Sequence, residues 1–153
     1  AHGLLLLGMI QSVQGNYSDA ESNYLTALEL MIEIYGSENR YVADLLYKLG
    51  YIYHDQGRFD DAIYVYEQSI SIYEKSLGLE HPDLALVLDG LAGIYIALGR
   101  NADALPLVRE ALRISEKALG SEDLDVAAII LNLGKKFLSV PFEFFLLPHP
   151  YFS

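Results

Sequence analysis

The sequence predicts an all-α solenoid of stacked helical hairpins, and three observations lead to that prediction. Glycine recurs every 42 residues, apolar residues recur at helical spacing between the glycines, and polar turns follow the glycines. At an offset of 42 residues, three sets come into register: Gly15, Gly57 and Gly99; Ala20, Ala62 and Ala104; Gly36, Gly78 and Gly120. The chain therefore contains three full repeats and half of a fourth.

The first helix of each repeat is expected to bury one face. In the second repeat, the residues at helical spacing are Leu46, Leu49, Gly50 and Tyr53. Glycine can adopt the left-handed conformation that ends a helix, so this helix is predicted to end at Gly57. Asp60 is then expected to cap the helix that follows.

The second helix of each repeat is predicted to be longer than the first. In the second repeat its apolar positions are Ala62, Tyr66, Ile70, Tyr73 and Leu77, and it is expected to end at Gly78. Pro82 suits the first turn of the next helix, because the N–H that proline lacks would have no partner there. Pro106 lies early in the last of these helices, where we expect a mild kink without a break. Since one hairpin cannot cover its own apolar face, neighbouring repeats must stack.

Composition and charge narrow the classes of partner. The 153 residues include 10 Lys and Arg against 21 Asp and Glu, a formal net charge of -11. This charge argues against nucleic acid and anionic lipid as partners and favours neutral or basic proteins. The longest apolar runs are too short to span a bilayer, so we expect no membrane insertion. Cysteine is absent, which excludes disulfides and thiolate metal sites, and a cytosolic or nuclear location fits best, with the cytoplasm as our prediction.

Motifs for catalysis or cofactor binding are missing from the sequence. We find no HExxH zinc motif, phosphate-binding glycine loop, GxSxG turn or calcium loop. The four histidines do not have the spacing of metal ligands: they are His2, His54, His81 and His149. We therefore predict no enzymatic activity, no cofactor and no metal.

A resemblance to a known family is carried by the segment "LGYIYHDQGRFDDAIYVYEQSISIYEKSLGLEHPDLA". Its small residue beside Leu49, its "QGR" turn followed by Ala62, its "SIYEKSLG" helix end and its "HP" link resemble the 42-residue tetratricopeptide repeat of kinesin light chains and nephrocystin-3-like proteins. The resemblance implies a right-handed α-α superhelix over residues 1–136. Its repeats would span about 1–42, 43–84 and 85–126, with a partial repeat at 127–136.

The same resemblance implies a concave groove lined by the first helix of each repeat. The groove-facing, partner-binding positions would be Leu5, Met9, Tyr47, Tyr51, His54, Asp89 and Ile96. Such a groove suits an extended peptide or a helix, so we predict a protein interaction scaffold or adaptor. An alternative role for Leu5 and Met9 is packing against a preceding repeat. Two other functions stay open: a regulatory or oligomerising arm of a larger signalling protein, and, with the least support, a small helical enzyme.

Residues 137–153 break the repeat pattern. The segment "FLSVPFEFFLLPHPYFS" holds five of the six Phe and three of the five Pro in the chain. Because proline interrupts helices and central strands, we expect irregular structure there. The segment would either lie over the open end of the array or act as a short aromatic docking peptide. The chain also begins with Ala1 inside a repeat, as expected of a processed or partial chain.

Overall fold

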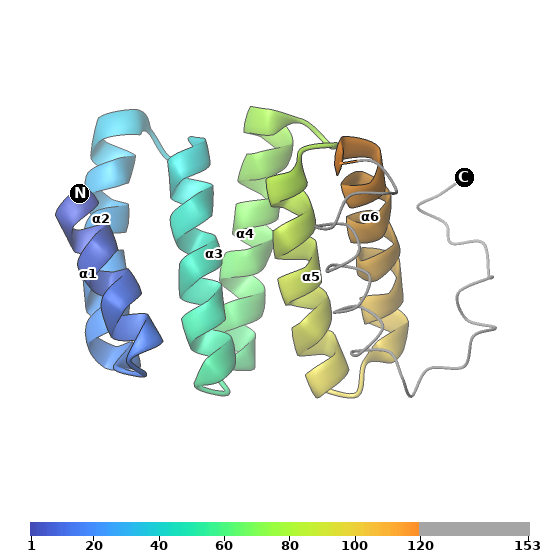
Figure 1. Cartoon of the computed structure of the whole chain (residues 1–153), viewed down its shortest axis with the longest axis horizontal. Coiled ribbons are helices and arrows are strands. Elements are labelled where there is room, and N and C mark those ends of the chain that lie inside the picture. Colours follow the sequence, from blue (N-terminus) through green and yellow to red (C-terminus); the bar gives the residue numbers. More distant parts are fainter. Residues whose placement is uncertain (120–153) are drawn as a thin grey trace. The chain divides into compact units, whose positions relative to one another are not determined.

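A computed structural model describes residues 1–119, and within this range every regular element is an α-helix (Figure 1). The first compact unit, residues 1–78, holds α1 (His2–Val13), α2 (Tyr17–Tyr35), α3 (Arg40–Asp55) and α4 (Phe59–Leu77). The second unit begins at Leu79 and holds α5 (Pro82–Ala97) and α6 (Asn101–Leu119). The predicted partial repeat at 127–136 and the Phe/Pro-rich tail at 137–153 lie outside the described residues.

The helices pair as the sequence predicts. Each helix of 19 residues (α2, α4, α6) follows a shorter one of 12 or 16 residues (α1, α3, α5), which confirms the unequal lengths. Within the first unit α1 packs on α2 and α3 on α4, and α2 also packs on α3, so the two hairpins stack. Small residues lie where helices cross: Ala20, Ala62 and Ala104, one in each repeat, are fully buried.

The turns inside the hairpins are closed by glycine in the left-handed region. Gly57 has a φ of 73°, as predicted, and the residue after it, Arg58, donates its backbone N–H to the Tyr53 carbonyl at 2.8 Å. This tight closure starts α4 at Phe59, which leaves Asp60 inside the first helical turn. The prediction that Asp60 caps α4 is therefore wrong, because the N-cap position belongs to Arg58.

A side-chain bridge recurs at these turns with the 42-residue period. Arg58 Nε donates to Asp61 Oδ2 at 2.9 Å, and Arg100 Nε donates to Asp103 Oδ2 at 2.8 Å. Each guanidinium also lies over a tyrosine ring, with Arg58 4.2 Å from the centroid of Tyr53. These contacts fix the turn against the end of the preceding helix.

The links between repeats supply helix caps. Pro82 is the first residue of α5, as predicted, and the His81 side chain accepts a hydrogen bond from the Asp83 N–H through Nδ1 at 3.1 Å. In the preceding link, Asn39 Oδ1 accepts from the Tyr41 N–H at 3.0 Å. The helix α6 continues through Pro106, so the expected absence of a break is confirmed.

A close fit between glycine and tyrosine joins the two helices of the first two hairpins. A Cβ atom placed on Gly50 of α3 would lie 2.3 Å from Cε1 of Tyr66 on α4. The same fit occurs between Gly8 of α1 and Tyr24 of α2, at 2.6 Å. At the matching positions of the third repeat, Ala92 and Val108 are buried together in one cluster. A glycine on the first helix is thus matched by a large ring on the second, and the larger Ala92 is matched by the smaller Val108, so the core stays filled.

The outer face of α1 differs from the pattern of the other first helices. Leu7 is 45% exposed, whereas Leu49, its equivalent in α3, is 1% exposed. The difference follows from packing, because α3 contacts both α4 and α2 while α1 packs mainly on α2. The expectation of a buried apolar face therefore holds for α3 and fails for part of α1.

Candidate peptide-binding site

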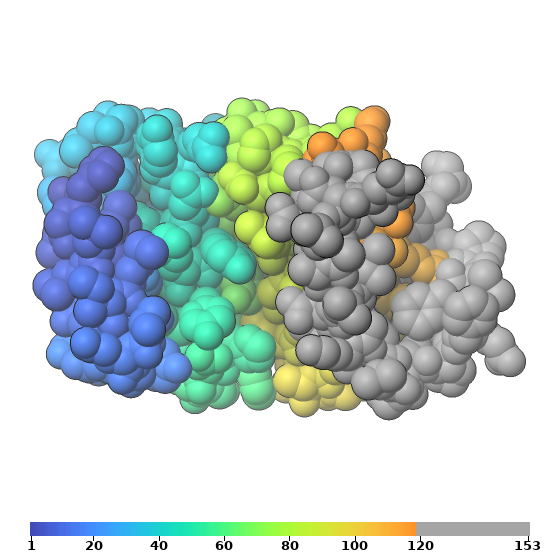
Figure 2. Space-filling view, viewed as in Figure 1, coloured from blue at the N-terminus to red at the C-terminus, as the bar shows by residue number. Residues whose placement is uncertain are grey.

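A pocket of about 200 Å³ opens between α1 and α3 in the first unit. Its lining comes from α1 through Met9, Ser12 and Val13, from α3 through Tyr47, Lys48 and Tyr51, and from α2 through Tyr24. Figure 2 shows side chains of α1 and α3 on the face of this unit that is turned to the reader. The structure therefore brings together three of the predicted groove residues: Met9, Tyr47 and Tyr51.

The glycine–tyrosine fits position the aromatic part of the pocket. The ring of Tyr24 lies on Gly8 and is only 3% exposed, so it forms the floor. The ring of Tyr47 lies against that of Tyr66, with 5.9 Å between centroids and 34° between planes. Since the Tyr66 ring is itself packed on Gly50, it gives the Tyr47 ring a fixed surface to pack against. The aromatic wall is thus set by contacts inside the hairpins.

A carboxylate lies at the edge of this aromatic wall. Asp55 follows Tyr51 by one helical turn on α3, and its Oδ2 accepts a hydrogen bond from the Tyr17 hydroxyl at 2.9 Å. The negative charge of Asp55 raises the pKa of Tyr51, and the hydrogen bond to Asp55 raises the pKa of Tyr17. Both phenols are therefore harder to ionise than a free tyrosine, and they lie beside one exposed carboxyl group.

The other predicted groove residues lie outside the pocket lining. Leu5 is half-buried on α1, and the ring of His54 contacts that of Phe59, with centroids 5.9 Å apart. Asp89 and Ile96 belong to α5 in the second unit, where both are half-buried. A role in binding stays a prediction for all seven groove residues.

Several lining residues were missed by the sequence analysis. Ser12 and Val13 lie one helical turn from Met9, and helical spacing alone could have found them. Tyr24 was not among the predicted groove residues, although it forms the floor of the pocket. The pair of Tyr17 and Asp55 is separated by 38 residues and carried no signal in the sequence.

Residues 1–119 also bear on metal binding and on membrane spanning. No group of three or more His, Cys, Asp or Glu side chains in that range could hold a metal ion. None of the helices described there combines the length and the hydrophobicity needed to cross a bilayer.

Comparison with known proteins identifies the repeat. A family profile described as tetratricopeptide repeat matches residues 1–75, 41–117 and 83–139. The chain belongs to the tetratricopeptide repeat family. This match and the structural matches that follow confirm the predicted all-α fold of tetratricopeptide repeats. None of the curated proteins matches the chain.

Solved tetratricopeptide-type structures share the fold. BtubC (BKLC) from P. vanneervenii superposes with a TM-score of 0.81 at 21% identity, over 93% of this chain and 57% of that chain. A second match is a Podospora anserina protein described as a kinesin light chain with nearly identical TPR-like repeats. Its structure, in a form with one substitution, superposes with a TM-score of 0.77 at 22% identity, over 90% of this chain and 65% of that chain. A second structure of that repeat protein superposes with a TM-score of 0.69 at 23% identity, over 89% of this chain and 64% of that chain. The chain thus spans less than two thirds of the length of these structures.

Proposed function

We propose that this chain is a protein interaction scaffold or adaptor that binds peptide segments of other proteins between α1 and α3. Tetratricopeptide repeats generally mediate contacts between proteins. The observation that supports this site is the convergence of Met9, Tyr47 and Tyr51 on one pocket with an aromatic floor. Tyrosine is a common anchor in such sites because a rigid ring gives much contact area with little loss of side-chain entropy.

The pocket fits a peptide with one apolar anchor residue, and a basic residue beside that anchor is favoured by Asp55 and by the net charge of the chain, which together outweigh the single positive charge of Lys48 in the lining. Met9, Val13 and the tyrosine rings offer apolar contact, and a pocket of about 200 Å³ has room for a single large side chain. Asp55 lies beside this anchor position, and the whole chain carries a formal charge of -11. A Lys or Arg next to the anchor would approach Asp55 and would be attracted by the field of the protein.

The test uses peptides selected from a displayed random library on the full chain, then resynthesised and measured by fluorescence polarisation. We expect the selected peptides to be enriched in Lys or Arg beside a large apolar residue. We also expect Tyr51→Ala to weaken their binding at least about tenfold, as loss of an aromatic anchor usually does. Tyr51 is 50% exposed, so this variant should keep the helical content of the wild-type chain.

Tyr41→Ala is the matched control. Tyr41 lies on the same helix and is 47% exposed, but it contacts Tyr35 and does not line the pocket. We expect its affinity for the selected peptides to stay close to the wild-type value. Equal binding by the two variants, or failure to select any peptide, would rule out this site.

The alternative of an oligomerising or regulatory arm is supported by the outer face of α1. This helix contains no Asp, Glu, Lys or Arg, and Leu6, Ile10 and Val13 are more than half exposed. If that face joins two chains, light scattering should give a mass that rises with concentration, and Ile10→Asp should restore the mass of one chain. A constant mass for the wild-type chain would remove the support for this alternative.

We further propose a role without catalysis, in the cytoplasm. Repeats of this family generally act as scaffolds. The absence of cysteine from the whole sequence is compatible with a reducing compartment.

A further inference from the structure

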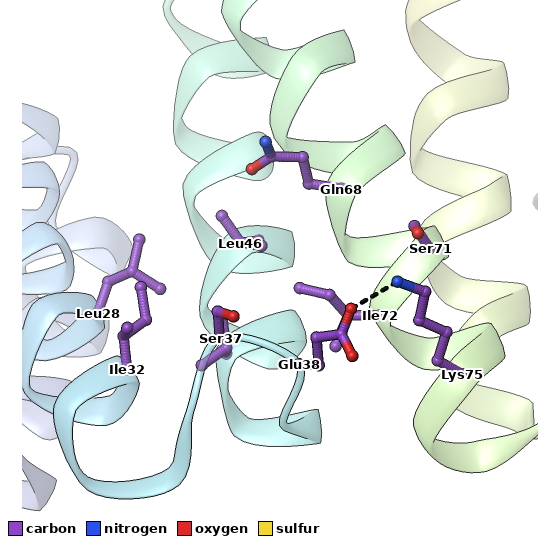
Figure 3. Close-up of a pocket in the computed structure, with 10 residues that line it drawn as sticks. Leu28, Ile32, Ser37, Glu38, Leu46, Gln68, Ser71, Ile72 and Lys75 are labelled. Carbon is purple, nitrogen blue, oxygen red and sulfur yellow. Dashed lines mark hydrogen bonds and ion pairs between the residues drawn. The ribbon is translucent and has the colours of Figure 1, made fainter.

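A second hollow, of about 330 Å³, lies between the two longer helices of the first unit (Figure 3). We call it the α2–α4 slot. Its walls and floor are formed by Leu28 and Ile32 of α2, Val42 and Leu46 of α3, and Gln68 and Ile72 of α4. Its residues differ entirely from those of the pocket between α1 and α3.

Two ion pairs hold the walls of the slot. Glu38, in the link before α3, accepts a hydrogen bond from Lys75 of α4 at 2.5 Å, and Figure 3 shows this pair at the rim. Two turns of α2 before Leu28, Glu21 pairs with Arg58 at 2.9 Å, just before α4 begins. Both basic groups are therefore already paired with carboxylates of the same chain.

The slot is open, and an apolar strip runs through it along α2. Leu25, Leu28 and Ile32 share one face of α2 because they lie three, four and seven residues apart. Leu25 and Ile32 are each 41% exposed although both are large apolar residues. On α4, Tyr64 lies one turn before Gln68, a residue of the slot lining, and is 62% exposed. Of these three exposed side chains, Ile32 lines the slot itself, while Leu25 and Tyr64 extend the exposed apolar surface along α2 and α4. Exposed apolar side chains grouped in this way are typical of an interaction surface.

Acidic side chains follow the slot on both walls. Glu29 and Glu33 are neighbours of Ile32 on α2, and Glu67 and Glu74 lie one turn on either side of Ser71, which lines the slot on α4. All four glutamates are exposed. An apolar strip bordered by negative charge fits a ligand with an apolar stripe and basic flanks.

The backbone of the slot selects between an extended ligand and a helical one. The walls are α-helices, whose interior N–H and C=O groups are already hydrogen-bonded within each helix. An extended peptide would find no main-chain partners there, whereas a helix brings its own backbone satisfied and needs only a groove for its apolar stripe.

We propose that the α2–α4 slot is a docking site for a basic amphipathic helix of a partner protein. The helix places Leu or Ile at positions i, i+4 and i+7 between α2 and α4, and its Lys or Arg residues face the glutamates on both walls. This site is separate from the peptide site between α1 and α3, and it does not depend on that site.

The probe is a synthetic helical peptide of about 15 residues, long enough to hold about four turns. It carries Leu at i, i+4, i+7 and i+11 and Lys at the flanking positions, and its binding to the full chain is measured by calorimetry. We expect Ile32→Lys to weaken binding at least about tenfold, because it places a charge in the apolar strip and repels the basic probe. Ile34→Lys is the matched control, since it adds the same charge two residues further along α2 at a site 62% exposed and outside the slot. We expect that control to bind within about twofold of the wild-type chain.

Four results would overturn the proposal. Equal affinities of the Ile32→Lys and Ile34→Lys variants would show that only overall charge attracts the probe. A loss of binding in Tyr51→Ala as large as that in Ile32→Lys would place the probe in the pocket between α1 and α3. If the chain instead self-associates without the probe and Ile32→Lys makes it a monomer, the occupant is a second copy of the chain. A probe with Glu in place of Lys should bind at least about tenfold more weakly, and equal binding would contradict the predicted basic flanks.

Discussion

Gly50→Ala is expected to lower the free energy of unfolding by about 2 kcal/mol, as overpacking of a core does. At an ordinary helical position the same change raises stability by about 0.5–1 kcal/mol. Here the new methyl group would lie 2.3 Å from Cε1 of Tyr66. The Tyr66 ring is 1% exposed and is covered on another side by Tyr47, so it has no free space into which it can move. Urea unfolding of the full chain, followed by circular dichroism, measures the change.

The third repeat supplies the control for this prediction. There the corresponding pair is Ala92 and Val108, so a smaller second residue accompanies the added methyl group. Tyr66→Val alone should destabilise the chain by about 3 kcal/mol, because it leaves a cavity. We expect the double variant with Gly50→Ala to be at least about 1 kcal/mol more stable than the sum of the single effects. Strict additivity would show that the contact between the two residues is not the cause. Gly3→Ala, where a Cβ atom would meet no neighbour within 4 Å, should not destabilise the chain.

Raising the pH above 10 is expected to destabilise the first unit through Tyr53. Burial raises the pKa of Tyr53 from 10.0 to about 12, with a further contribution from Glu21. The unfolded chain then loses this proton near pH 10, whereas the folded chain retains it until about pH 12. The stabilisation is therefore complete below pH 10 and is lost as the pH rises through 12. Because solvent screens part of the interaction, the loss from this residue is about 1 kcal/mol at pH 11 and approaches about 2 kcal/mol above pH 12.

Unfolding of Tyr53→Phe at pH 8 and pH 11 isolates this effect from the other groups that ionise in alkali. Relative to the variant, the wild-type chain should lose about 1 kcal/mol of unfolding free energy between pH 8 and pH 11. An unchanged difference would mean that Tyr53 ionises at the same pH in the folded and the unfolded chain. Because the chain has 12 tyrosines, the difference in tyrosinate absorbance between the wild-type chain and Tyr53→Phe gives an independent titration of Tyr53 in the folded state.

The repeat period determined most of the fold that could be predicted. Gly57 and Gly78 mark helix ends because few other residues adopt a positive φ, and the structure gives them 73° and 85°. Pro82 begins a helix because its chemistry allows few other positions. Asp60 was assigned wrongly, because capping preferences assume a looser turn than the one that Arg58 closes on the Tyr53 carbonyl. The sequence indicates which residues end a helix more reliably than it indicates where the next one starts.

The candidate site was predictable only in part. The resemblance to the tetratricopeptide repeat implied groove-facing positions for Met9, Tyr47 and Tyr51, and the structure brings these three residues to one pocket. The contact of Tyr17 with Asp55 depends on the distance between two different helices, which no local pattern specifies. The α2–α4 slot was missed for a related reason. Leu28 and Ile32 have the spacing of core residues, and only the structure shows that Ile32 remains 41% exposed.

The fit of Tyr66 on Gly50 also bears on how such an array can lengthen during evolution. Both members of the pair lie in one hairpin, so a gene duplication that copies the hairpin copies the two complementary shapes together. A recombination that joined a glycine-bearing first helix to the second helix of the third repeat would place Val108 opposite that glycine and leave a void. The reverse exchange would drive a tyrosine ring into Ala92. The hairpin is therefore the unit that can be duplicated without loss of packing, whereas a breakpoint within a hairpin would disrupt the fit between its two helices.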